Sequence, residues 1–124
     1  MKNTKYQLIK FTVSQAQEKV RLIFDTNTLY EHVDGIFISL PHENSYSGSR
    51  IELFMNGEEI FPMDFEVKLL ATNLSVAPNE RFFNLKDEHI KAHGNHAEGY
   101  FTDAGNGVYP YEGIIYLKLT NPQN

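Results

Sequence analysis

The residues best suited to chemistry lie in one short histidine-rich segment. His89 and His93 are four residues apart, so one turn of helix would place both imidazoles on the same face. His96 and Glu98 follow shortly after and could add an imidazole and a carboxylate. Zinc and similar ions bind such nitrogen and oxygen donors. One hypothesis is therefore a cupin-like, metal-dependent enzyme whose ligands are His89, His93, His96 and Glu98.

A second group of residues, closer to the C-terminus, suits ligand recognition. The ring of Tyr100 could stack on a sugar, and Asp103 and Asn106 carry groups that hydrogen-bond to hydroxyls. Tyr109 and Tyr111 flank Pro110 and could extend such a surface. This second hypothesis is a carbohydrate- or ligand-binding β-sandwich with a glycan as its partner.

Other catalytic patterns are missing from the sequence. It contains no Gly-x-Ser-x-Gly motif and no glycine-rich phosphate loop. Zero cysteine excludes a disulfide scaffold, a thiolate metal site and a cysteine nucleophile. The net charge of −5 argues against a nucleic-acid partner, because such proteins neutralise phosphates with excess positive charge. The leading expectation is a protein that is not an enzyme and needs no cofactor.

The elements that must position these residues are strands. The chain has 124 residues, of which 41% are hydrophobic and 22% charged, as in ordinary globular domains. Apolar residues alternate with period two, and Asn56-Gly57 is typical of a two-residue hairpin turn. We expect an all-β fold, a single domain over 1–124, built as an antiparallel β-sandwich or a small barrel of about eight strands. The expected strands cover 6–13, 20–24, 36–40, 51–55, 58–61, 65–70, 100–102 and 113–119.

Connections and breaks between the strands are also predicted. One helical turn is expected at 14–18 and a short helix at 87–92, while Pro62 should end the strand after the hairpin. Ala77-Pro78-Asn79 indicates a turn. Residues 6–13 alternate instead of forming the continuous apolar run of a signal peptide, and no run reaches membrane-span length. We therefore expect a cytoplasmic origin without a membrane span.

Several strands are apolar on both faces, notably 36–38 and 113–117. A strand that faces water on one side alternates cleanly, so these strands need cover on both sides. A small sandwich has only one interior, and we expect another chain to cover the second face. The candidate interface residues are Ile114, Tyr116, Tyr109, Tyr111 and Phe83, although the tyrosines between 100 and 116 could instead fill the core. The expected partners are copies of this chain, other structural proteins of the same assembly, or both.

The rhythm of strands over nearly the whole chain resembles one family. The segments 50–62, 65–70 leading to 81–85, and 113–119 are similar to those of small single jelly-roll virion proteins. These are vertex (penton) or minor coat proteins of tailless icosahedral bacterial viruses. The resemblance implies an eight-stranded sandwich, symmetric oligomers around a vertex, no catalysis and a place in the virion after assembly in the host cytoplasm. The family has no signature motif, so it assigns no functional residue here.

Overall fold

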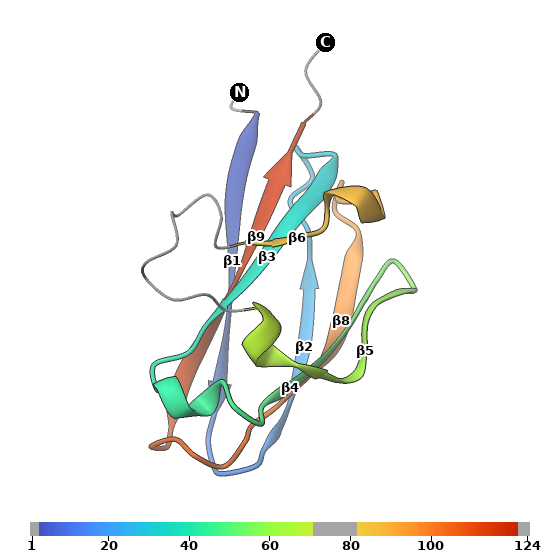
Figure 1. The fold of residues 1–124 in the computed structure, drawn as a ribbon. Coiled ribbons are helices and arrows are strands. Elements are labelled where there is room, and N and C mark those ends of the chain that lie inside the picture. The colour runs from blue at the N-terminus through green and yellow to red at the C-terminus, as the bar shows by residue number, and fades with distance from the viewer. Residues whose placement is uncertain (1–2, 71–81, 122–124) are drawn as a thin grey trace.

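The computed structural model describes residues 3–70 and 82–121. In this part of the chain, nine strands form two antiparallel sheets, and the helical elements are short 3₁₀ turns (Figure 1). The all-β prediction is therefore confirmed. The strands are β1 (Thr4–Val13), β2 (Lys19–Asp25), β3 (His32–Ser39), β4 (Arg50–Met55), β5 (Glu58–Glu66), β6 (Phe83–Asn84), β7 (Ile90–Lys91), β8 (His96–Thr102) and β9 (Tyr111–Thr120).

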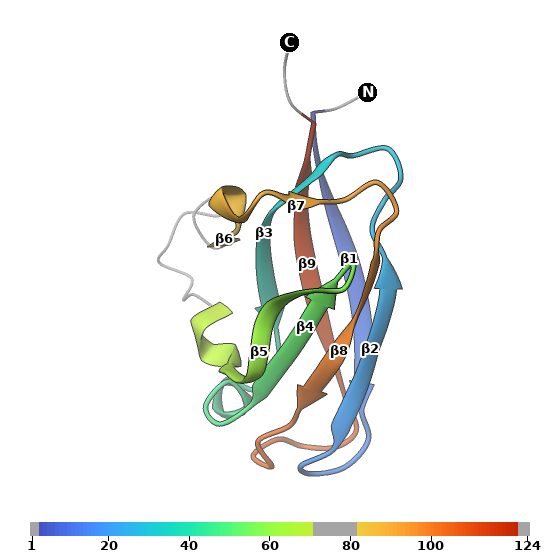
Figure 2. The same cartoon turned by 90° about the vertical axis from the view of Figure 1, so that its right-hand side faces the viewer.

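The strand order of the two sheets is that of a jelly roll. The first sheet has the order β1-β9-β3-β6, with β7 also pairing with β3, and the second has the order β2-β8-β4-β5. The strands pair from the two ends of the chain inward: β1 with β9, β2 with β8, β3 with β6, and β4 with β5. Each pair is thus nested inside the previous one in the sequence. Two sheets wrapped in this manner form a double-sheet jelly roll. The turned view in Figure 2 shows both layers.

The alternation of side chains places the core between the sheets. In β9, Ile115, Leu117 and Leu119 are fully buried, while the residues between them point to the other face. Phe101 from β8 and Leu53 from β4 meet them from the second sheet and are also fully buried. Burying a large apolar side chain contributes about 1.5–3 kcal/mol. This shared interior is what holds the two sheets together.

The prediction that Pro62 ends a strand is wrong, because β5 runs through it to Glu66. β5 is the edge strand of the second sheet, so the missing N–H of proline can face away from its partner strand at no cost. The expected strand over 65–70 is correspondingly divided. Phe65 and Glu66 belong to β5, and Val67–Leu70 forms a 3₁₀ turn whose Val67 and Leu70 are buried.

The short helix expected at 87–92 is also absent, and the residues expected to form a helical turn at 14–18 form a hydrogen-bonded turn between Gln15 and Glu18, with a left-handed backbone at Gln17. A 3₁₀ turn covers Lys86–Glu88, and His89 follows with a left-handed φ of 53°, which stops any right-handed helix from continuing. The hairpin turn is confirmed, with φ of 54° at Asn56 and 79° at Gly57. The predicted turn at 77–79 lies outside the described residues. Within 3–70 and 82–121, no helix is long and apolar enough to cross a membrane.

Gly99 in β8 is required by a close approach of two strands. A Cβ built there would lie 1.9 Å from the carbonyl oxygen of Glu52, and backbone cannot rotate away as a side chain can. We expect Gly99→Ala to lower the free energy of unfolding by about 3 kcal/mol, measured by urea denaturation. Gly57→Ala is the matched control, because no atom lies within 4 Å of that position and only backbone strain of about 1–2 kcal/mol applies. A smaller loss for Gly99→Ala than for Gly57→Ala would contradict the close approach.

Candidate functional site

The outer face of the first sheet carries one fully apolar row of side chains across β1, β9 and β3, with further apolar residues in the rows on either side of it. Leu8, Tyr116 and Phe37 are register partners and form one row. Ile114 is the central residue of a neighbouring row. The rings of Phe37 and Tyr116 lie 6.0 Å apart, within the usual range for an aromatic pair. These side chains point away from the core because their strand neighbours point into it.

The row of Tyr6, Lys118 and Gly35 gains an aromatic side chain from Phe82, which lies outside these three strands. Tyr6 and Gly35 both pair with Lys118, and Gly35 has no side chain to cover this part of β3. Phe82 fills the gap, because a Cβ on Gly35 would lie only 2.9 Å from the Cβ of Phe82. The Phe82 ring stacks on Tyr6 at 5.4 Å and lies 6.1 Å from the Phe37 ring. Residues far apart in sequence thus form one continuous cluster.

We call this cluster the aromatic face, defined as Tyr6, Leu8, Phe37, Phe82, Ile114 and Tyr116. The exposed fraction is 45% for Tyr6 and 49% for Leu8, and the other four are partly exposed. A contiguous apolar patch of this kind on a small protein marks an interaction surface more often than chance exposure does.

Two of the five predicted interface residues belong to the aromatic face and three do not. Ile114 and Tyr116 point outward, as an interface requires. Phe83 instead points inward and packs edge-on against Phe61 at 5.8 Å and Phe65 at 6.1 Å. Its neighbour Phe82 takes the outer position. Tyr111 is only 5% exposed and belongs to the interior.

Tyr109, the fifth predicted interface residue, is held with Tyr111 in a polar network around Asp103. Asp103 is 3% exposed. Its Oδ2 accepts hydrogen bonds from the Tyr109 hydroxyl at 2.6 Å, the Gly105 N–H at 2.8 Å and the Gln17 N–H at 3.0 Å, and its Oδ1 accepts one from the Tyr111 hydroxyl at 2.6 Å. The network ties the β1–β2 turn to the β8–β9 connection and to the start of β9.

The Asp103 network sets the charge state of its members. Burial raises the pKa of the Asp103 carboxyl, but the hydrogen bonds from both tyrosines and two backbone N–H groups outweigh burial and hold that pKa below its usual value. Burial, followed by the hydrogen bond to Asp103, raises the pKa of Tyr109 and of Tyr111. The carboxylate is therefore ionised and the two phenols are neutral donors over the physiological range.

The predicted ligand site of Tyr100, Asp103 and Asn106 is not assembled. Asp103 is buried with its oxygens already occupied, so it cannot serve a surface ligand. Tyr100 lies on the outer face of the second sheet, where the Lys19 ammonium sits 4.5 Å from the ring centre. The hollow beside Tyr100 measures only about 80 Å³ and is lined by neither Asp103 nor Asn106.

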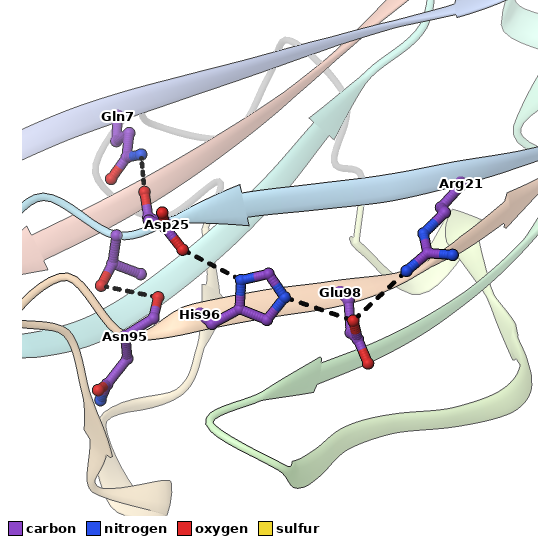
Figure 3. Close-up of polar contacts among 7 residues, drawn as sticks. Gln7, Arg21, Asp25, Asn95, His96 and Glu98 are labelled. Atoms are coloured by element: carbon purple, nitrogen blue, oxygen red, sulfur yellow. Dashed lines mark hydrogen bonds and ion pairs between the residues drawn. The ribbon is translucent and has the colours of Figure 1, made fainter.

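His96 lies on the outer face of the second sheet between two carboxylates (Figure 3). Its Nδ1 is 3.1 Å from Asp25 Oδ1 and its Nε2 is 3.3 Å from Glu98 Oε2, and Arg21 approaches Glu98 at 3.7 Å. The hydrogen bond with Asp25, followed by that with Glu98, raises the pKa of His96. Both ring nitrogens thus have a carboxylate partner, which favours the protonated ring, whereas a histidine that binds a metal ion must be neutral.

The other predicted metal ligands are not gathered around His96. His93 lies 3.3 Å from the Thr28 carbonyl oxygen and 3.9 Å from Glu31. His89 lines a different hollow, because its left-handed backbone prevents the helical turn that would have stacked it on His93. Over the described ranges, no group of three or more histidine, cysteine, aspartate or glutamate side chains is placed to hold a metal ion.

The two outer faces thus differ in chemistry. The first sheet presents the aromatic face, whereas the second presents a chain of exposed ion pairs along β2 and β8. The residues that sequence reasoning missed are Tyr6, Leu8, Phe37 and Phe82. Tyr6 and Leu8 lie on the face of the first strand opposite the buried Phe11 and Val13, so both faces of that strand carry apolar residues, and Phe37 lies in the segment 36–38 that is predicted above to need cover on both faces. No family model, curated protein or solved structure matches this chain.

Removing the Asp103 carboxylate should destabilise the fold. Asp103→Ala leaves two hydroxyls and two N–H groups without their acceptor, and we expect a loss of about 3 kcal/mol in the free energy of unfolding at pH 7. Because the folded-state pKa is depressed, this contribution is present above the unfolded pKa and is lost as pH falls through the folded value. Asn106→Ala, in the same connection but exposed, is the control and should change stability by under about 0.5 kcal/mol. Equal effects of the two variants at pH 7 would show that the network does not support the fold.

His96 should titrate above its usual pKa of about 6.5. We expect Asp25→Asn and Glu98→Gln each to lower the His96 pKa measured by NMR titration, while Glu112→Gln, on the other sheet, leaves it unchanged. A raised pKa means that the stabilising contribution of these pairs is present below the unfolded pKa and is lost as pH rises through the folded value. A wild-type pKa at or below 6.5 would contradict the described contacts.

Proposed function

We propose that this chain is a non-enzymatic structural subunit that assembles into a symmetric homo-oligomer, as a capsid or vertex protein of a virion does. The observation that supports the proposal is the aromatic face. Its side chains cover the outer side of the central strand β9 and both of its neighbours, where the second sheet of the same chain cannot reach them.

The composition of the aromatic face fits an interface. The centres of protein–protein interfaces are enriched in aromatic residues and depleted of lysine, with charged groups at the rim. Here the row of Leu8, Tyr116 and Phe37 carries no charge, and Lys10 and Lys118 occur in the flanking rows. Removing this surface from water supplies the main driving force for association.

The jelly-roll strand order supports the proposal at the level of fold. Double-sheet jelly rolls serve as viral capsid subunits, but also as lectins and cupins. The last two uses need a ligand or metal site, and the residues predicted for those sites are not brought together in the described structure. The resemblance to small virion proteins in strand rhythm points the same way as the aromatic face.

Assembly should depend on the outward residues of β9. We expect Tyr116→Asp and Ile114→Asp each to weaken self-association at least about 100-fold, because each places a charge in an apolar contact. The measurement is oligomer mass by light scattering and native mass spectrometry, with circular dichroism to confirm that the fold is kept.

Ile23→Asp is the matched control for these variants. Ile23 is 56% exposed on the outer face of the second sheet, so its substitution should leave the oligomer mass unchanged. A wild-type protein that stays monomeric at millimolar concentration would overturn the proposed function. So would an oligomer that tolerates both β9 variants.

A further inference from the structure

A polar hollow borders the aromatic face near the beginning of β1 and the end of β9. Two depressions of about 450 and 490 Å³ share Thr4, Asp34, Lys86 and Thr120 among their lining residues. Phe82 also lines the second of them, so the hollow is continuous with the aromatic face. We call it the basic hollow and define it by Thr4, His32, Asp34, Lys86, His89, Lys118 and Thr120.

The basic hollow holds an excess of positive charge in a chain whose net charge is −5. Lys86 and Lys118 form no ion pair with any residue in the described ranges. The single carboxylate of the hollow, Asp34, accepts a hydrogen bond from the Thr120 hydroxyl at 2.8 Å. An occupant of complementary charge is therefore an anion.

A group with that charge lies elsewhere on the same chain. The turn between β4 and β5 presents Glu58 and Glu59 next to Asn56 and Gly57, and all four residues are exposed. Neither carboxylate forms an ion pair with a described residue. The turn projects at the right-hand edge of the molecule in Figure 1, away from the ends of β1 and β9. We call it the acidic turn.

One molecule cannot bring these two features together. The acidic turn is fixed in the second sheet by the pairing of β4 with β5, and the basic hollow is fixed on the outer side of the first sheet. A second copy of the chain can supply the missing partner. Contacts between two different patches run head to tail and close into a ring when the rotation between copies closes, as the symmetric oligomer proposed above requires, whereas contacts of one patch with itself give a two-fold dimer.

We propose that the basic hollow of each subunit receives the acidic turn of a neighbouring copy, which makes the oligomer a head-to-tail ring. This inference rests on the proposed function. The aromatic face supplies buried apolar surface, and the paired charges beside it fix which part of the neighbour is bound. Charge pairs at an interface rim act mainly in this way, on orientation and specificity.

Charge reversal tests the pairing. One variant carries Glu58→Lys with Glu59→Lys, a second carries Lys86→Glu with Lys118→Glu, and a third carries all four substitutions. We expect each two-site variant to weaken self-association at least about ten-fold at 0.1 M salt, since like charges then face each other. The four-site variant should recover most of the wild-type association, because every contact is again between opposite charges.

The matched control is Glu43→Lys with Glu52→Lys, which changes net charge as much as the reversal of the acidic turn does. Neither glutamate lines the basic hollow or forms an ion pair with a described residue. Loss in both two-site variants with recovery in the four-site variant supports the inference. An oligomer that responds no more to reversal than to the control, or that is not recovered, overturns it while leaving the proposed function standing. A monomeric wild type removes both.

Discussion

The structure depends on the constraint that a two-layer sandwich has one interior, whereas each of its strands has two faces. β9 lies between β1 and β3 in the first sheet, and its inward residues Ile115, Leu117 and Leu119 are fully buried in the core. Its outward residues Ile114 and Tyr116 are apolar as well, and the second sheet packs on the opposite side. The chain therefore meets its own need for a core and leaves a second apolar surface beyond its reach.

The polar groups divide into those that stabilise the fold and those that face solvent. Asp103 accepts four hydrogen bonds at one end of the sandwich and links the β1–β2 turn, the β8–β9 connection and the start of β9. His96 and its carboxylates lie on the surface of the second sheet, where solvent screens them. The Asp103 network therefore stabilises the fold, whereas the ion pairs around His96 contribute little to stability because they are exposed.

Much of the fold could be predicted from the sequence, because period-two alternation and the Asn56-Gly57 turn are local signals. The nested pairing was reached only by resemblance in strand rhythm, since nothing local states which strand pairs with which. Local sequence signals gave wrong or incomplete predictions where the position of a residue in the folded molecule determines its role. Pro62 is tolerated because β5 is an edge strand, and the choice between Phe82 and Phe83 depends on the space left by Gly35 on another strand. The predicted metal site is not formed because the spacing of His89 and His93 brings their side chains together only in a helix. The left-handed backbone at His89 prevents a helix there.

The pairing of β1 with β9 also has a consequence for how the molecule forms. The backbone N–H of Asn121 donates a hydrogen bond to the carbonyl oxygen of Asn3, so the first and the last described residues are neighbours. Such distant pairing gives a high contact order, which slows folding. During synthesis β1 and β3 must wait for β9 to leave the ribosome, with their facing edges unpaired until then. β9 completes the first sheet and is the last of these strands to be synthesised. The time before it arrives therefore sets how long the nascent chain is exposed to misassociation.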